Sequence, residues 1–263
     1  MESWSDCLDL DRIAADHGTP LYLTNINQLG RNLDRFVSLV GKPSCVAYPV
    51  KANPSLSVLV ELARLGAAAD CASEIEVKLA AAAGFGTDRI IYNGPAPDHD
   101  LLIALLKSGV AVVADSEPIL RMIDECCLPG EIAGRLLVRI NPKVDLSYLK
   151  HTAWEESVAH ASDSSKFGIP SEEIVPLLQT IRVPVSGIHL HVGTQMDNLA
   201  SFLRALELLH SIVDQIHEKT DQTIDSIDLG GGLGIPFQDD QLFPTIDEYA
   251  SKLRPHLRNS FHY

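Results

Sequence analysis

Short apolar runs alternate along the chain with longer segments in which apolar residues recur every three or four positions. The runs resemble buried strands, and the longer segments resemble amphipathic helices. We expect strands at residues 45–48, 67–71, 89–92, 111–114, 135–140, 183–189 and 226–229. Helix-patterned sequence lies between most of them, for example at residues 56–65, 74–83 and 101–108. This order predicts repeated βα units around a parallel sheet.

Seven such units are one fewer than a closed barrel requires. We therefore predict an α/β fold of the (β/α)8 TIM-barrel type that is incomplete at the eighth strand. An open parallel sheet leaves long edges, so either an eighth strand begins near residues 261–263 or a partner covers the edge. A further β-like run at residues 20–23 has no place in the barrel, and we assign it to a second domain.

Composition narrows the class of protein. With 263 residues and 46% hydrophobic content, the chain suits one large α/β domain. A net charge of -14 opposes binding to nucleic acid or anionic membranes. No apolar run or N-terminal pattern suggests a membrane span or signal peptide, so we expect a cytoplasmic protein. The five cysteines form no CxxC pair, and we expect neither disulfides nor zinc.

The first candidate for chemistry is Lys51, in the run Tyr-Pro-Val-Lys-Ala-Asn that follows the first predicted strand. A lysine at the carboxyl end of a barrel strand points to where such barrels hold substrates, and a desolvated amine can form a Schiff base with an aldehyde. The aldehyde suggested is pyridoxal phosphate. A solvated loop lysine is the alternative interpretation.

The second candidate is the glycine run Gly230, Gly231, Gly232, which follows the seventh predicted strand. Successive glycines let backbone N–H groups converge on an anion, and barrel phosphate sites often form at this position. The run therefore predicts a phosphate cradle, with a purely structural turn as the alternative.

Two histidines mark the end of the sixth predicted strand. His189 and His191 point to the same side of a strand, because side chains repeat every second residue. We expect one of them to belong to the core and His191 to stack on a flat cofactor, while Thr194 offers a hydroxyl to a phosphate. A metal site is less favoured, because no third ligand follows at a suitable spacing.

Charged residues also end two apolar strands. Asp70 could accept hydrogen bonds from the lysine or from a cofactor hydroxyl. Arg139 would be costly to bury alone, and pairing with Asp70 is one solution. Ser73 and Glu76, just beyond Asp70, match a helix-capping box and need no functional explanation.

Taken in order, these motifs resemble the pyridoxal-phosphate-dependent decarboxylases of the alanine-racemase-like fold, the group of diaminopimelate and ornithine decarboxylases. Tyr-Pro-Val-Lys-Ala-Asn, Asp-Cys-Ala-Ser, Asn-Gly-Pro, Lys-Phe-Gly, His-Val-Gly-Thr-Gln and Gly-Gly-Gly-Leu-Gly-Ile-Pro occur in the family's order. The resemblance implies that Lys51 binds the cofactor covalently and that His191 stacks on its ring. It also implies that Thr194 and the three glycines hold the phosphate. From their positions at strand ends, we expect Asp70 and Arg139 to take part in binding the cofactor as well.

The resemblance also carries expectations about the whole protein. It assigns residues 25–263 to the pyridoxal-phosphate-binding barrel and residues 1–24 to a segment that contributes to a β-domain. The family's Glu-Pro-Gly-Arg strand and C-terminal β-domain are not found in these 263 residues. We therefore expect the isolated chain to be poorly active. The family also implies a homodimer.

The substrate is left open between branches of the family. Arg139-Ile-Asn-Pro, Lys166-Phe-Gly-Ile and Gly232-Leu-Gly-Ile are closer to the diaminopimelate branch, and Asp70-Cys-Ala-Ser to the ornithine branch. We favour decarboxylation of a diaminopimelate-like diamino acid. An ornithine-type decarboxylase and a non-catalytic pyridoxal phosphate binding protein are the alternatives, and an amino-acid racemase ranks last.

Overall fold

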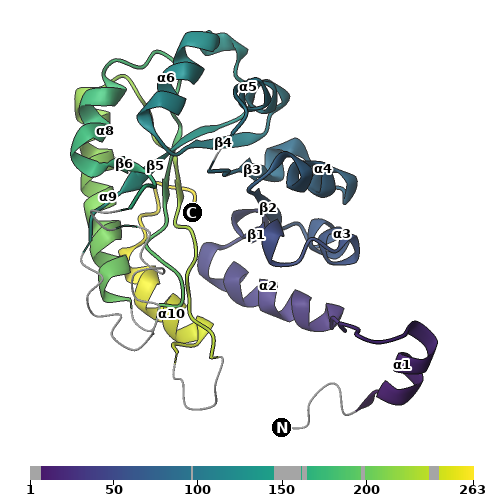
Figure 1. The fold of residues 1–263 in the computed structure, drawn as a ribbon. Helices are drawn as coiled ribbons and strands as arrows, with labels where there is room; N and C mark the ends of the chain where they lie inside the picture. Colours follow the sequence, from purple (N-terminus) through teal and green to yellow (C-terminus); the bar gives the residue numbers. More distant parts are fainter. Residues whose placement is uncertain (1–6, 96, 145–160, 162–164, 197–198, 237–242) are drawn as a thin grey trace.

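One parallel sheet forms the centre of the molecule. The computed structural model describes residues 7–95, 97–144, 161, 165–196, 199–236 and 243–263. Within them the strands follow the order β1-β2-β3-β4-β5-β7-β8, and β6 pairs with β5. The strands are β1 Ala47–Pro49, β2 Ala68–Cys71, β3 Ile90–Tyr92, β4 Ala111–Ala114, β5 Leu136–Asn141, β6 Ile169–Pro170, β7 Gly187–Leu190 and β8 Ser226–Asp228. The sheet curls and the helices lie outside it (Figure 1), which confirms the predicted barrel class.

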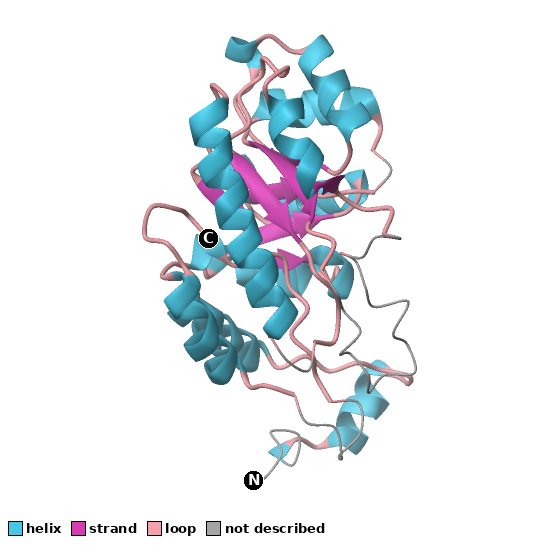
Figure 2. Ribbon diagram, turned by 90° about the vertical axis from the view of Figure 1, so that its left-hand side faces the viewer, coloured by secondary structure: helices cyan, strands magenta, loops and turns pink. Residues whose placement is uncertain are grey.

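From α2 onward, the helices lie outside the sheet and cover its outer face (Figure 2). They are α1 Leu10–His17, α2 Ile26–Val40, α3 Leu56–Arg64, α4 Glu74–Ala82, α5 His99–Ser108, α6 Glu117–Cys126, α8 Ser171–Leu178, α9 Ala200–Lys219 and α10 Ile246–Leu253. Short 3-10 helices occur at η2 Pro43–Cys45, η3 Val50–Ala52, η4 Thr87–Arg89, η5 Pro129–Glu131 and η6 Arg254–His256.

Capping residues set several of the helix boundaries. Asn25, Asp98 and Thr245 each accept a backbone N–H of the first helical turn, and Gly109 ends α5 in the left-handed conformation. Ser73 likewise caps α4, as its motif predicted. The Glu76 carboxylate accepts the backbone N–H of Ala72, one residue before the cap, at 2.7 Å.

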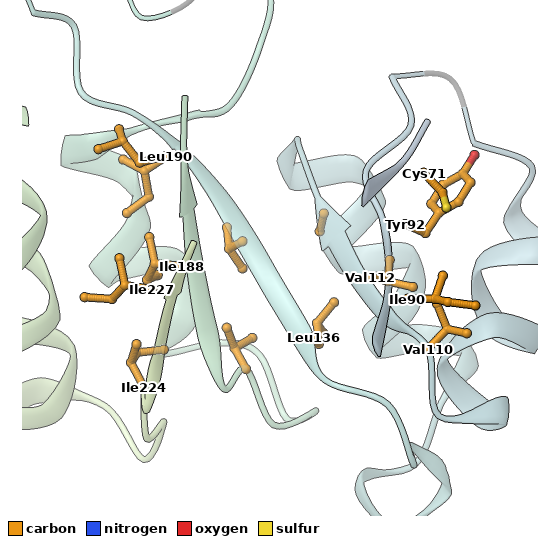
Figure 3. Packing of buried hydrophobic residues seen from close by; sticks show 14 of the residues in the cluster. Cys71, Ile90, Tyr92, Val110, Val112, Leu136, Ile188, Leu190, Ile224 and Ile227 are labelled. Carbon is orange, nitrogen blue, oxygen red and sulfur yellow. The ribbon is translucent and has the colours of Figure 1, made fainter. Parts of the chain in front are cut away.

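The two faces of the sheet bury different kinds of side chain. Outward-facing residues such as Val112, Leu136 and Ile188 pack against the helices in the main hydrophobic core (Figure 3). Inside the curl, Ala111, Val113 and Leu137 form a small separate cluster with Ile91. Because side chains alternate along a strand, the next inward positions on β5 and β7 are Arg139 and His189, which are polar. The polar residues therefore collect inside the sheet, at the carboxyl ends of its strands.

The observed strands match the seven predicted ones in order, with one instructive difference in length. The strand predicted at residues 183–189 begins only at Gly187. The backbone N–H groups of Val183 and Val185 donate to the side chains of Asp124 and Gln222, both at 2.8 Å, instead of to a neighbouring strand. Pro184, between them, has no N–H to donate. The two-residue strand β6 was not predicted.

The β-like run at residues 20–23 forms no strand in the structure and, as expected, has no place in the barrel. None of the described strands pairs with it, and Tyr22 is 96% exposed. β-propensity alone cannot form a strand where no neighbour supplies hydrogen bonds. The adjoining helix α1 buries no residue and lies apart from the sheet (Figure 1). The assignment of residues 1–24 to a second domain stays a prediction.

Residues near the C-terminus occupy the position predicted for an eighth strand. His262 forms a parallel bridge with Ser226. The His262 N–H donates to Asp225 O at 2.9 Å, and the Ile227 N–H donates to His262 O at 2.8 Å. Pairing next to β8 therefore begins at residues 261–263, as expected. No helix in the described part of the chain is long and apolar enough to span a membrane.

Candidate functional site

A row of polar side chains crosses three neighbouring strands. In the strand register, Arg139 of β5 lies beside His189 of β7, and His189 lies beside Asp228 of β8. Residues that are paired in a sheet point to the same side, so all three side chains enter the interior of the curl. Arg139 is 8% exposed and His189 is 3% exposed. This buried row forms the floor of the candidate site.

Asp70 faces the same interior from the end of β2. Burial raises the pKa of its carboxyl group to about 7, and the negative charge of Asp228 adds to the rise. Lys51 opposes the rise, as does a hydrogen bond from the Asn93 side chain. The next residue, Cys71, points outward into the helix layer beside Tyr92 (Figure 3), where burial raises the pKa of its thiol to about 12.

Lys51 lies in the short helix η3, directly after β1, and its side chain is exposed. The prediction placed it at the end of a buried strand with a desolvated amine. The position is confirmed, but the burial was wrong: β1 ends at Pro49, and the chain turns before the lysine. The ammonium group still acts electrostatically on Asp70 and His189, so it lies at the mouth of the same interior.

Arg139 is held among three carboxyl groups and one aromatic ring. Its strongest electrostatic partner is Asp115, followed by Asp228 and then Asp70. The guanidinium carbon lies 4.6 Å from the centre of the Phe167 ring, within the range of a cation–π interaction. Asp70, the partner suggested by the sequence, is therefore one of several and not the strongest.

His189 is neutral. Burial lowers the pKa of its imidazole to about 3, and the charges of Arg139 and Lys51 contribute in the same direction. Its Nε2 atom lies 3.4 Å from Nδ2 of Asn93. Its Nδ1 atom is buried and has no hydrogen-bond partner in the described part of the chain.

The loops after β7 and β8 are joined to each other above this floor. The Met196 N–H donates to Gly232 O at 2.8 Å, and the Gly234 N–H donates to Met196 O at 3.2 Å. The Gln195 side-chain amide donates to Ile235 O and accepts from the Ile235 N–H, both at 2.9 Å. These contacts bring the predicted histidine motif and the glycine run together.

Two of the three glycines are required by their geometry. Gly230 has a φ of +65° and Gly232 a φ of +111°, and a Cβ at Gly232 would lie 2.0 Å from Gly193 O. Gly231 is different, because a Cβ there would meet nothing within 4 Å. The Gly230 N–H donates to Oδ1 of Asp228 at 2.8 Å, and the Gly231 N–H lies 3.4 Å from Nδ1 of His191.

The structure brings most of the predicted residues to one end of the barrel. His191 contacts the glycine turn, and Thr194 lies exposed in the joined loop beside it. The structure adds three residues to the site. Asp115 was not identified from the sequence, and no role was predicted for Asn93 or Asp228. Each directly follows or ends an apolar strand, the signal that also identified Asp70.

The described residues contain no group of three or more His, Cys, Asp or Glu side chains arranged to hold a metal ion. The segment at residues 152–158, which departs from the diaminopimelate motif, lies outside the described residues. So does most of the aperiodic stretch at residues 143–165.

Comparison with known proteins identifies similar chains. The family model described as "Pyridoxal-dependent decarboxylase, pyridoxal binding domain" matches residues 26–263, in agreement with the cofactor expected from the sequence. Diaminopimelate decarboxylase from Zymomonas mobilis is 31% identical over 257 residues, which cover 94% of this chain and 59% of the relative. The enzyme of that name from Methanothermobacter thermautotrophicus is 33% identical over 251 residues, covering 93% and 56%.

A solved structure agrees with these relatives. Diaminopimelate decarboxylase from M. jannaschii, in complex with L-lysine, superposes with a TM-score of 0.78 at 28% identity. The superposition covers 94% of this chain and 59% of that one. The chain thus spans less than two thirds of the length of these relatives.

Proposed function

Because the chain belongs to the pyridoxal-dependent decarboxylases through their pyridoxal-binding domain, we propose that it binds pyridoxal phosphate and serves the decarboxylation of a diaminopimelate-like diamino acid. The observation that carries this proposal is the meeting of Lys51, the Asp70–Arg139–His189 interior and the glycine turn at one end of the barrel. A cytoplasmic location and a homodimer stay predictions.

The residues at this end of the barrel fit the cofactor. Gly230 and Gly232 adopt conformations that favour glycine, and the open space at Gly231 leaves its backbone accessible to an anion. His189 Nδ1 is buried and has no hydrogen-bond partner in the described part of the chain. A bound molecule can form a hydrogen bond with it. Lys51 and Arg139 supply positive charge near a phosphorylated, anionic ligand.

Each residue then has a proposed part in holding the group. The glycine turn and the Thr194 hydroxyl hold the phosphate, with the Gly231 N–H exchanging its 3.4 Å contact with His191 Nδ1 for a phosphate oxygen, and His191 packs on the ring. Lys51 is the covalent attachment point. When bound, pyridoxal phosphate supplies the electron sink that makes loss of the α-carboxylate possible.

The chain's own groups prepare Lys51 for this role. A lysine is nucleophilic only after its Nζ has lost a proton. Above about pH 7 the Asp70 carboxyl group is ionised, so it can act as a proton acceptor at this end of the barrel. Arg139 keeps positive charge in the interior throughout, while neutral His189 adds none.

The diaminopimelate branch is favoured over its alternatives by the relatives. The matched proteins at 31% and 33% identity are both named diaminopimelate decarboxylases. The ornithine-type alternative rests on Asp70-Cys-Ala-Ser alone. A non-catalytic pyridoxal phosphate binding protein would use the same Lys51 and glycine turn. Only a measurement of turnover distinguishes it from a decarboxylase.

The test is carbon dioxide release from diaminopimelate, ornithine and lysine in the presence of pyridoxal phosphate. Because the chain spans only 59% of the Zymomonas mobilis relative, we expect release to be slow but measurable, fastest from diaminopimelate and abolished by Lys51→Ala. Lys78→Ala, which removes an exposed lysine of α4 paired with Glu74, is the matched control and should leave release unchanged. Faster release from ornithine would favour the ornithine type, and cofactor binding without any release would overturn the decarboxylase proposal.

A further inference from the structure

Asn93 follows β3 and lies between two interior groups that belong to different strands. Its backbone N–H donates to Cys71 O at 2.8 Å, which fixes the residue beside the end of β2. Its side-chain Nδ2 reaches across to His189 Nε2 at 3.4 Å, and its side chain also hydrogen-bonds to Asp70. We propose that Asn93 is a positioning residue that fixes the tautomer of His189.

The orientation of the Asn93 amide follows from its two neighbours. Above its pKa of about 7 the Asp70 carboxylate only accepts hydrogen bonds, so in that pH range it requires the NH2 end of the amide. The same NH2 group has a second hydrogen for His189. Turning the amide over would place its carbonyl oxygen against the Asp70 carboxylate, with two acceptors facing each other.

This orientation decides which nitrogen of His189 carries the proton. Because the Asn93 NH2 can only donate, His189 Nε2 must accept. A neutral imidazole then carries its hydrogen on Nδ1. Nδ1 has no partner in the described part of the chain, although His189 is only 3% exposed. The geometry therefore presents a buried N–H donor that can bind an acceptor atom of a bound molecule.

The effect on Asp70 has a definite sign. Its carboxyl group faces Asp228 at the end of β8, Lys51 after β1 and Glu76 on α4, and it acts on Arg139 of β5. Burial and the two acidic neighbours favour the neutral acid, whereas Lys51 and Asn93 favour the carboxylate. Loss of the Asn93 amide therefore raises the pKa of Asp70 further above its present value of about 7.

The effect on Asp70 rests on the proposed function, since an ionised Asp70 matters only as a proton acceptor at this end of the barrel. The tautomer does not depend on it. The effect of Asn93 on Asp70 can therefore be tested by the pH dependence of cofactor capture. The tautomer of His189 can be tested separately, on the protein without cofactor.

The first test is the tautomer of His189, read from the 15N chemical shifts of its ring by long-range 1H–15N correlation. His189→Gln identifies the signals by their loss. We expect the Nδ1–H form in the protein without cofactor. The Nε2–H form or an imidazolium near neutral pH would overturn the proposal, whatever the protein does with pyridoxal phosphate.

Two variants extend this test. Asn93→Asp replaces the donor by a carboxylate, so His189 should switch to the Nε2–H form. Asn93→Ala should remove the preference and shift the acid side of the pH profile of pyridoxal phosphate capture to higher pH. Asn32→Ala, which removes an exposed amide of α2, should change neither result. An unchanged tautomer in Asn93→Asp, or an unshifted profile in folded Asn93→Ala, would contradict the role of Asn93.

Discussion

At the scale of single residues, one carboxyl group sets the pH range over which the barrel interior changes charge. Asp70 has a pKa of about 7, chiefly because burial disfavours its charged form. The ordinary value for this side chain is near 3.8. Because the folded-state pKa is the higher one, the folded chain holds the Asp70 proton more tightly than the unfolded chain does.

Asp70→Asn should therefore change how stability depends on pH. From about pH 4 to about pH 7, the wild-type protein should lose stability relative to Asp70→Asn, because folding retains a proton that the unfolded chain releases. Full burial would give about 4 kcal/mol, and partial solvent access reduces this to about 2 kcal/mol.

Urea unfolding of both proteins at the two ends of this pH range measures the difference. Asp221→Asn, at an exposed position outside the site, is the matched control. A stability difference between wild type and Asp70→Asn that stays constant with pH would show that Asp70 titrates normally.

At the scale of elements, the site depends on the joining of the loops that follow β7 and β8. The glycine turn fits against the 193–196 loop so closely that Gly232 has no room for a side chain. Gly231 lies one residue away with open space around it. The chain thus contains its own control for the effect of a methyl group on this turn.

Gly232→Ala should destabilise the fold and weaken pyridoxal phosphate binding, whereas Gly231→Ala should leave the stability of the fold unchanged. The first change places a Cβ 2.0 Å from Gly193 O at a φ of +111°, at a cost of at least about 2 kcal/mol. Gly231→Ala keeps the backbone N–H and meets no atom within 4 Å. Denaturant unfolding and cofactor titration measure both effects. Equal losses in the two variants would contradict the proposed close fit.

The sequence could predict the parts of the site that lie within one motif. Residue type alone, directly after an apolar strand, identifies Lys51, the glycine run and the histidine motif. Asn93 and Asp115 do not, because a lone asparagine or aspartate after a strand also suits a turn or a helix start. Their roles arise from the curl of the sheet, which brings Asn93 to His189 across 96 positions of sequence.

At the scale of the whole molecule, the last residues complete the packing beside β8. The Tyr263 hydroxyl accepts from the Arg258 N–H at 2.7 Å and lies 3.0 Å from Nε2 of His210 on α9. The ring of Phe261 stacks on that histidine with a centroid distance of 6.1 Å. These contacts hold His262 in place for its pairing with β8.

Deleting residues 261–263 should therefore release the edge of β8. The Ile227 N–H would lose its acceptor, His262 O, and its amide hydrogen should exchange much faster with solvent. The lost pairing and packing should lower stability by about 2–3 kcal/mol. Tyr263→Phe keeps the backbone pairing, so protection of Ile227 should largely remain. Unchanged exchange in the deletion variant would show that His262 does not stabilise this edge.

The order of the strands followed from the sequence because each strand is a compact apolar run. The ends of the barrel followed only in part, because they depend on contacts between distant segments: a strand beginning near residues 261–263 was one of two outcomes expected from the sequence. Residues 20–23 have the composition of a strand but no partner, whereas His262 pairs with β8 despite its polar side chain.

The central claim is that Lys51 captures pyridoxal phosphate at this end of the barrel. In the most direct measurement, the cofactor is added to the purified protein and the bond between cofactor and lysine is reduced with borohydride. The modified lysine is then mapped by mass spectrometry. We predict a visible absorbance band on addition and a single pyridoxyl group on Lys51, with both retained in Lys78→Ala. No band, or a band and labelling pattern unchanged in Lys51→Ala, would contradict the account.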